Sequence, residues 1–428
     1  MSNLLHAAGQ DWRSRGTVER YAFPEDWSAR EYRVGEMAEL ADPEVASRLR
    51  APFPYRGAEA VLQEMARGKR RVVVLFDDLS RWTPAYRLAP PLLDVLLRAG
   101  VEGSGIHFLA AIGSHRAMSR EEMTLKLGAQ VVERYRVSNH DCFSDEVVEV
   151  GTGRYGTPIR LAREVVEADL VIGLGMLCPH GFAFTSGGSK IILPGVAHVD
   201  TIRLNHRSAR GGRFEPSELR GDGEEARYGP IRAEMNEAAA MLMERTRVVV
   251  IDAVLSRGRG IADLAIGDPL AVLEQAEAQM RRYRVSFDRA DKADIGVFRV
   301  DSLDPLQYYK GMEGWEQACE RRIVVGDFSD RLIYQGQRYG RVEEHLRRLA
   351  GLGPMPNPPL REALAEPGTV FLCSPNLDRA SVRSFSPLFY VAPDWDALVA
   401  DLRRELGPGR RVAFFPDSFL QILQVEEP

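Results

Sequence analysis

Three segments of this 428-residue chain combine charged or imidazole side chains with turn residues in patterns that could do chemistry. The first, Asp77–Pro84, follows the β-branched run RVVVLF and places the Asp78 carboxylate three residues before the Arg81 guanidinium. On a turn both groups can face a ligand, and arginine suits bidentate binding of a carboxylate or phosphate. A local ion pair beside a proline turn is the alternative interpretation, and this segment alone leaves both open.

The second segment, Gly113–Arg116, follows the apolar run GIHFLAAI. His115 stands next to the expected end of a strand, where a histidine can serve as an acid or a base. A structural histidine hydrogen-bonded within a loop is the competing interpretation and, for an isolated histidine, the commoner one.

The third segment is the most specific and reads PHGFAFTSGGSKIILPG over residues 179–195. It contains His180 and Lys190, and His206 follows the lysine by sixteen residues. Glycine lets the backbone approach a ligand closely, a desolvated lysine can become a nucleophile, and neutral imidazole is a ligand compatible with nickel. Aromatic and apolar residues fill this stretch, whereas a surface linker is usually polar.

A fourth motif, GTGRYG over residues 151–156, fits the dinucleotide-binding pattern but lacks its context. That fingerprint must open a helix, whereas the residues TPIRL that follow here indicate a strand. We therefore predict a hairpin turn. The sequence also contains neither an H-E-x-x-H pair nor a G-x-S-x-G elbow, so a zinc peptidase or a serine hydrolase is not supported.

Composition narrows the class of protein. The net charge of −5, from 56 basic and 61 acidic residues, predicts neither a nucleic-acid nor an anionic-membrane partner. No apolar run approaches the roughly 18–20 residues of a membrane helix, and the first residues lack the apolar region of a signal peptide. Four scattered cysteines indicate neither a disulfide framework nor a thiolate metal site. A reduced, cytoplasmic enzyme is the expectation.

The elements that must position these segments alternate between strands and helices, which predicts an α/β fold with largely parallel or mixed sheets flanked by helices. In such sheets ligands bind beyond the carboxyl ends of strands, where the three segments fall. We expect buried strands over residues 169–175 and 247–254 and a helix that begins at a capping box of Ser119 and Glu122. We also expect irregular structure over about the first 65 residues and a helix over residues 306–320. We expect an N-terminal domain over 1–255, a C-terminal domain over 268–416 closing over a site in the cleft between them, and a tail, 417–428, returning to the first domain.

Taken together and in this order, the motifs resemble the lactate racemase family, over roughly residues 70–310. The resemblance rests on the spacing from His180 to Lys190 to His206 and on these stretches: Asp78-Leu-Ser80-Arg81-Trp-Thr-Pro84, Gly113-Ser-His115-Arg116, Asn139-His140-Asp141, Pro179-His180, Ser186-Gly187-Gly188-Ser-Lys190, Pro194-Gly195 and Asn205-His206.

The resemblance implies a racemase or epimerase of an α-hydroxy acid that uses a nickel-pincer nucleotide, made by separate cofactor-biosynthesis enzymes. Lys190 would carry the covalent cofactor, and His206 would ligate nickel. The other implied roles are cofactor binding by Asp78, Gly187, Gly188 and Gln307, substrate binding by Arg81 and Lys310, and acid/base catalysis by His115 and His180.

Hydride removal to a cofactor would avoid a carbanion, and two histidines on opposite faces of the substrate would let either enantiomer react. Trp82 and the pair Phe184-Thr185 depart from the family pattern, which favours a hydroxy acid larger or more polar than lactate. Two alternatives remain: net redox chemistry with the same cofactor, and a non-catalytic binding protein on the same scaffold. The second predicts loss of the histidine and lysine set, which this chain retains.

Overall fold

The computed structural model describes residues 4–8, 18–181, 183–207, 227–300, 314–326, 360–366, 369–377 and 389–426. The chain forms two compact units. One, which we call the motif unit, is built on Met37–Arg281. The other, the terminal unit, combines Met1–Glu36 with Arg282–Ile333 and Arg338–Pro428. Each unit is an α/β structure, as the alternating pattern predicts.

The motif unit is organised around a six-stranded sheet of order β15-β14-β11-β6-β7-β8. Neighbouring strands run parallel except for β15, which is antiparallel to β14. Its central strands are short apolar, β-branched runs that are buried on both faces, as parallel sheets require. The bounds are β6 (Val72–Phe76), β7 (Ile106–Ala110), β8 (Arg136–Asn139), β11 (Leu170–Leu177), β14 (Arg247–Leu255) and β15 (Ile261–Gly267).

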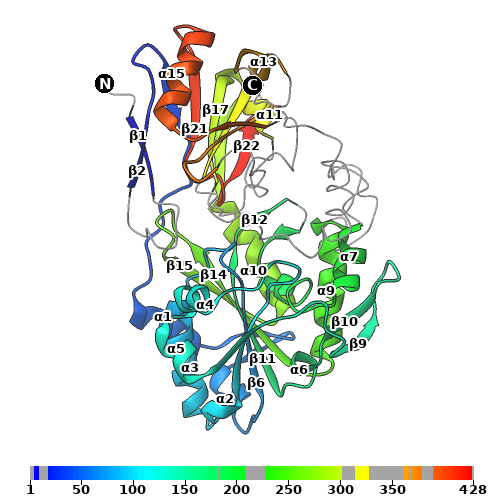
Figure 1. Cartoon of the computed structure of the whole chain (residues 1–428). Helices are drawn as coiled ribbons and strands as arrows, with labels where there is room; N and C mark the ends of the chain where they lie inside the picture. Colours follow the sequence, from blue (N-terminus) through cyan, green and yellow to red (C-terminus); the bar gives the residue numbers. More distant parts are fainter. Residues whose placement is uncertain are drawn as a thin grey trace. The chain divides into compact units, whose positions relative to one another are not determined.

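Helices flank this sheet, with α3 and α5 on one side and α7 and α9 on the other (Figure 1). In α3 the buried residues Leu88, Leu92 and Leu96 recur every four positions, which gives the helix one apolar face. The helices are α1 (Asp42–Arg50), α2 (Leu62–Ala66), α3 (Ala85–Arg98), α4 (Arg120–Leu127), α5 (Ala129–Arg134), α6 (Arg163–Val166), α7 (Val199–Arg207), α9 (Pro230–Met243) and α10 (Pro269–Arg281), with 3₁₀ turns at Gly103–Gly105 and Gly188–Ile191.

Two local predictions are confirmed in this unit. The GTGRYG motif belongs to an antiparallel hairpin of β9 (Val147–Thr152) and β10 (Pro158–Ala162) and does not open a helix. Ser119 and Glu122 form the expected capping box at the start of α4. Gly128, with φ of 87°, then separates α4 from α5. Shorter hairpins pair β4 (Phe53–Tyr55) with β5 (Ala58–Ala60) and β12 (Pro179–His180) with β13 (Phe184–Thr185).

The terminal unit contains a second six-stranded sheet, which is entirely parallel and has the order β20-β19-β18-β17-β21-β3. Its strands are β3 (Ser28–Glu31), β17 (Ala293–Arg299), β18 (Cys319–Val325), β19 (Val370–Cys373), β20 (Phe389–Ala392) and β21 (Arg411–Phe415). The unit also contains β1 (Leu4–Ala8), β2 (Val18–Ala22), β16 (Arg284–Asp288), β22 (Ile422–Glu426), α11 (Trp315–Ala318), α13 (Leu360–Ala365), α15 (Trp395–Leu406) and a 3₁₀ turn at Arg289–Asp291.

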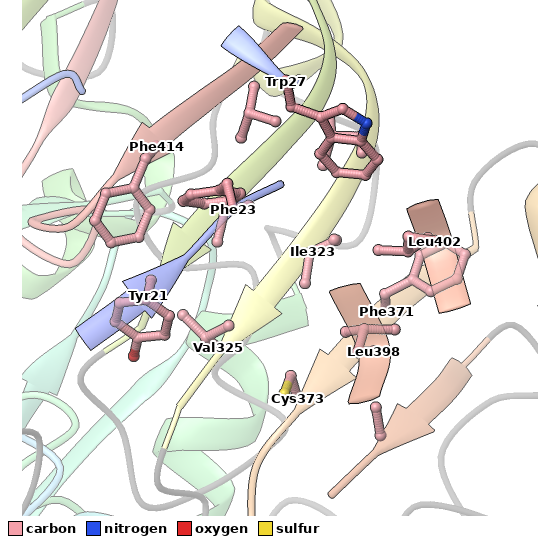
Figure 2. Close-up of a cluster of buried hydrophobic side chains, with 14 of the residues drawn as sticks. Tyr21, Phe23, Trp27, Ile323, Val325, Phe371, Cys373, Leu398, Leu402 and Phe414 are labelled. Carbon is pink, nitrogen blue, oxygen red and sulfur yellow. The ribbon is translucent and has the colours of Figure 1, made fainter. Parts of the chain in front are cut away.

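An apolar core joins the N-terminal segment to this sheet (Figure 2). The Tyr21 ring lies 5.2 Å from the ring of Phe414 on β21. Trp27 is buried, and its indole Nε1–H donates to the carbonyl oxygen of Gly407 at 3.0 Å. Residues from the two ends of the sequence therefore share one core.

The boundaries of the units differ from those expected from sequence. Residues before Met37 belong to the terminal unit, because β3 pairs with β21 and completes its sheet. The last residues also stay there, because β22 pairs with β16 rather than returning to the motif unit. The expectation of irregular structure over the first 65 residues is wrong, since β3, α1 and α2 lie in that stretch.

The helix expected over residues 306–320 is shorter at its end, because Cys319 begins β18 and pairs with Ala293; residues 301–313 lie outside the described part. All four cysteines are buried free thiols. Within the described residues, no helix is long and apolar enough to cross a bilayer.

Candidate active site

The strand order of the motif unit places the three predicted segments at the carboxyl-terminal edge of its sheet. In chain order, the strands proceed outward from β6 through β7 to β8, and then restart on the other side of β6 with β11 and β14. Between β6 and β11 the direction of winding reverses, and ligands of open α/β sheets bind at the carboxyl ends of strands beside such a switch point. Asp78 follows β6, and His180 follows β11.

Asp78 and His115 form a hydrogen-bonded pair across two strand ends. His115 Nδ1 donates to Asp78 Oδ2 at 2.5 Å, and the second carboxylate oxygen accepts from the Ser80 backbone N–H at 2.9 Å and from its hydroxyl at 2.5 Å. Burial opposes ionisation of Asp78, but the electrostatic attraction of His115, the hydrogen bonds from His115 and Ser80 and the charge of Arg81 outweigh it and lower the pKa of Asp78. Because Nδ1 carries the proton, Nε2 is the nitrogen of His115 that can exchange one with a ligand.

The turn that carries Asp78 and Arg81 is held by a buried lysine from α4. Lys126 Nζ donates to the carbonyl oxygens of Asp78 at 3.0 Å and of Arg81 at 2.8 Å, and pairs with the Asp77 carboxylate at 2.6 Å. Thr83 donates to the same Asp77 carboxylate. Arg81 itself is buried at 8% exposure. These contacts therefore fix the turn, and this pre-organises the side chains of Asp78 and Arg81.

The loop of His115 is tied to the end of the glycine-rich segment. Gly113 has φ of 55°, lies against Pro194 and donates its N–H to the Gly195 carbonyl oxygen at 2.9 Å. Asn139 accepts from the Met118 N–H and donates to its carbonyl oxygen, both at 2.9 Å. His140 is buried and donates from Nε2 to the Ala197 carbonyl oxygen, and its burial lowers its pKa. The Asn139-His140 motif thus organises loops.

Lys190 lies in the 3₁₀ turn Gly188–Ile191, and its surroundings disfavour the charged amine. Burial and the nearby cations of Arg81 and Arg232 lower the pKa of Lys190 to about 7, against weaker opposing effects of Asp78 and Cys178. No carboxylate among the described residues lies within ion-pair distance of its amine. A large share of Lys190 is therefore an uncharged amine near neutral pH, which is the form able to act as a nucleophile.

The glycines before Lys190 are required by close packing. A side chain at Gly187 would meet Asp252 Oδ2 at 2.2 Å, and Gly188 adopts φ of 64° while its N–H donates to that same oxygen at 2.6 Å. The two glycines therefore bring the backbone into contact with a buried carboxylate of β14, and this packing accounts for them without a ligand.

His206 lies near the end of α7 with a defined ring orientation. Its Nδ1 donates to the Ile202 carbonyl oxygen, one turn earlier, at 3.0 Å. A carbonyl oxygen can only accept, so Nε2 carries the lone pair, which is the arrangement typical of a metal-binding histidine. The preceding residue, Asn205, is buried and donates to the Glu234 carboxylate at 2.9 Å and to the Ile231 carbonyl oxygen at 3.3 Å, which anchors α7 against α9.

The predicted residues are only partly brought into contact. The structure joins Asp78 to His115 and places Lys190 within electrostatic reach of Arg81. His180 lies on β12, whose partner β13 leads into the glycines before Lys190. Gln307 and Lys310 lie outside the described residues. No group of three or more histidine, cysteine or acidic side chains is placed to hold a metal within the described residues.

Three further residues around this site were missed from sequence: Lys126, Arg232 and Asp252. Each is an ionisable residue that is itself buried, with exposures of 0%, 0% and 1%. A charge in a buried strand such as RVVVIDAV is a usable signal, because an ionisable group is rarely buried without a partner. Their partners, however, lie 43 to 64 residues away, beyond any local pattern.

Comparison with known proteins agrees with the motifs. Residues 17–214 match the model of the lactate racemase N-terminal domain. The lactate racemase of Thermoanaerobacterium thermosaccharolyticum is 36% identical over 279 residues, which cover 62% of this chain and 61% of the relative. That of Lactiplantibacillus plantarum is 36% identical over 146 residues, or 34% of each chain. The matches thus span less than two thirds of these curated relatives.

Solved structures show the same fold over a longer range. The apoprotein of lactate racemase from T. thermosaccharolyticum superposes with a TM-score of 0.69 at 21% identity, covering 99% of this chain and 100% of that one. A protein from Thermotoga maritima gives a TM-score of 0.64 at 18% identity, covering 92% and 100%. At these identities the likeness concerns the fold alone.

Proposed function

We propose that the chain is a member of the lactate racemase family and that it racemises or epimerises an α-hydroxy acid with a nickel-pincer nucleotide attached at Lys190. The observation that supports this most strongly is the electrostatic setting of Lys190. Lys190 is partly buried, and its amine has two arginines as neighbours and lies near the Asp78–His115 pair. A lysine in this setting is suited to a covalent bond rather than to a surface ion pair.

The residues present fit such a cofactor. Lys190 offers an uncharged amine for the covalent link, and His206 offers Nε2 as one nickel ligand because Nδ1 is committed to the Ile202 carbonyl oxygen. A cofactor that brings its own donors to nickel needs only such a single protein ligand. When bound, it supplies a hydride acceptor, and this allows the carbinol carbon to react without forming a carbanion.

The protein's own residues would move the proton and orient the substrate. Asp78 holds His115 through Nδ1, so Nε2 is the nitrogen that would take the hydroxyl proton and return it. His180 would perform the same task on the other face of the substrate. Arg81 would bind the substrate carboxylate through charge-assisted hydrogen bonds, a role that the family resemblance also implies for Lys310.

The residue beside Arg81 bears on substrate choice. Trp82 is 5% exposed, and the guanidinium of Arg259 lies 4.0 Å from the centre of its ring, a cation–π contact. This bulky, cation-covered side chain departs from the family pattern next to the proposed carboxylate-binding arginine. We therefore propose a substrate other than lactate, either larger or more polar, and a screen should cover hydroxy acids of both kinds.

The decisive experiment measures intact mass and nickel on protein produced together with the cofactor-making enzymes. We expect a nucleotide-sized adduct localised to Lys190, with nickel bound in step with it. Lys190→Arg is the matched control, since it keeps a cation but cannot form the link. Racemisation of a panel of hydroxy acids would follow. Unmodified, nickel-free protein from a host that loads a known lactate racemase would refute the assignment.

A further inference from the structure

Arg232 organises the backbone that leads to Lys190. From α9 its guanidinium donates to the carbonyl oxygens of Ala183 at 2.8 Å and Gly187 at 2.9 Å, and also to that of Thr185. The side chain has no exposed surface. A planar guanidinium carries five N–H donors in a fixed geometry, so it can hold several carbonyls of one irregular segment in an arrangement that a lysine ammonium does not reproduce.

The same helix also holds the residue next to the lysine. Ser189 accepts a hydrogen bond from Arg232 at 3.0 Å and donates to Asn236 Oδ1, one turn further along α9, at 2.5 Å. Ser189 is completely buried. The segment Ala183–Ser189 is therefore fastened to α9 along its length.

Asp252 holds this segment through the sheet. Its Oδ2 accepts the Gly188 N–H at 2.6 Å, while Oδ1 is buried and lacks a hydrogen-bond donor among the described residues. A Cβ atom at Gly175, its register partner on β11, would lie 2.4 Å from Oδ1. Burying an ionisable group with one unsatisfied oxygen costs stability, which the single hydrogen bond from Gly188 offsets only in part.

The charges around Lys190 affect how readily its amine loses a proton, and therefore how reactive it is. Its amine is influenced by Arg81 and Arg232, which disfavour protonation, and by Asp78 and Cys178, which favour it. Arg232 therefore acts on Lys190 in two ways, through the backbone that it fixes and through its own charge.

We propose that Arg232 and Asp252 are positioning residues that fix the Ala183–Ser189 segment and keep the Lys190 amine in place and reactive. This inference rests on the proposed function only where cofactor loading is concerned. The arrangement of the Ala183–Ser189 segment and of the Lys190 amine is a property of the apoprotein and does not depend on that function.

The first test measures acetylation of the Lys190 amine in the full-length apoprotein by acetic anhydride pulses across pH, with exposed Lys292 as the internal reference. For Arg232→Gln we expect the labelling midpoint to rise by about one pH unit, because a nearby cation is lost. Labelling at pH 7 should slow several-fold. Arg232→Lys keeps the charge, so its midpoint should stay near that of the wild type.

The second test measures amide hydrogen exchange of the segment. Arg232→Lys loses the planar donor set, so exchange at Gly187–Ser189 should become roughly tenfold faster. Asp252→Leu removes the acceptor of the Gly188 N–H and should accelerate the same amide, whereas Asp252→Asn keeps an acceptor and should not. Arg154→Gln is the matched control, because Arg154 pairs with Glu237 on the same helix but outside this segment.

The third readout is the fraction of protein carrying the Lys190 adduct after co-production with the cofactor-making enzymes. We expect it to fall several-fold in Arg232→Gln and Asp252→Leu but not in Arg154→Gln. If wild-type protein takes no adduct, the proposed function fails, and the labelling and exchange results alone decide this inference. Wild-type labelling in Arg232→Gln together with wild-type exchange in Arg232→Lys and Asp252→Leu would overturn it.

Discussion

The pairing of His115 with Asp78 makes this histidine better suited to proton transfer than His107 or His140. His140 is buried against a carbonyl oxygen, and His107 lies between Ser138 and Glu164 near the start of β7. His115 combines a carboxylate partner on Nδ1 with a partly exposed ring, 20% by side chain, at the carboxyl edge of the sheet. These features favour an acid/base role over the structural alternative.

Replacing this histidine should separate chemistry from cofactor binding. For His115→Gln we expect kcat to fall by about 10²–10⁴-fold, the usual contribution of a general acid or base. The Lys190 adduct and the nickel content should stay unchanged, because His115 is not assigned to either. Chiral chromatography of the hydroxy acid and intact mass provide the two measurements. An unchanged rate would return His115 to a structural role.

Asp252 should leave a signature in the pH dependence of stability. Burial raises the pKa of Asp252 to about 7. The hydrogen bond from the Gly188 N–H and the charge of Arg232 oppose this shift, whereas the charge of Asp77 increases it. In the unfolded chain an aspartate ionises near about 3.9. The folded state therefore binds this proton more tightly, and the stability that Asp252 contributes is lost as pH rises from about 4 through about 7.

The matching variant is Asp252→Asn, which cannot titrate. We expect the free energy of unfolding of the wild type, relative to this variant, to decrease between pH 5 and pH 8. Urea denaturation of both proteins at a series of pH values measures the difference. A difference that is constant or increases with pH would show that Asp252 is ionised in the folded protein at low pH.

At the scale of elements, the main contribution of α4 is to position Lys126. Its capping box fixes where the helix starts, and Lys126 then reaches the turn after β6. For Lys126→Met we expect a loss of about 3–5 kcal/mol in the free energy of unfolding, since Asp77 is left as a partly buried charge without its cation.

The double variant with Asp77→Asn should recover part of that loss, because the uncompensated carboxylate is gone. Urea denaturation gives the comparison, with Lys292→Met as the control for removing an exposed lysine. A loss no greater than that of the control would mean that the turn keeps its shape without Lys126.

Sequence patterns predicted the elements where the signal was local. The β-branched runs became β6, β11 and β14, the Ser119 box began α4, and the sequence after Gly156 formed a strand instead of a helix. The first 65 residues were misjudged because β3 is stabilised by its partner β21, far along the chain, rather than by its own alternation.

The residues of the candidate site also divide into those with a local sequence signal and those without one. The motifs indicated Asp78, His115 and Lys190 as candidates, because turn residues and strand ends are visible locally. They could not identify Arg232 or Asp252, whose importance comes from contacts made only after folding. Long-range polar contacts to irregular backbone have no sequence period, so only the structure reveals them.

At the scale of the whole molecule, the order of the chain and the order of the folded units differ. The chain starts in the terminal unit, leaves it at Glu36 to form the motif unit, and returns after Arg281. The sheet of the terminal unit therefore cannot be completed by the C-terminal residues alone, because its edge strand β3 comes from the other end. The N-terminal segment is synthesised first, but it completes the sheet of the unit whose other strands are synthesised last.

Trp27 provides the sharpest test of this arrangement. It is 3% exposed, packs in the core cluster of the terminal unit and donates to the Gly407 carbonyl oxygen. We expect Trp27→Ala to destabilise that unit by about 3–5 kcal/mol, the usual cost of removing a buried aromatic side chain. Hydrogen exchange should accelerate in β17 and β21, while β6 and β11 keep their protection. Trp27→Phe, which keeps a ring but loses the N–H donor, should show a smaller effect of the same pattern. Equal loss of protection in β6 and β11 would instead show that the two units unfold as one, and that the N-terminal segment stabilises both.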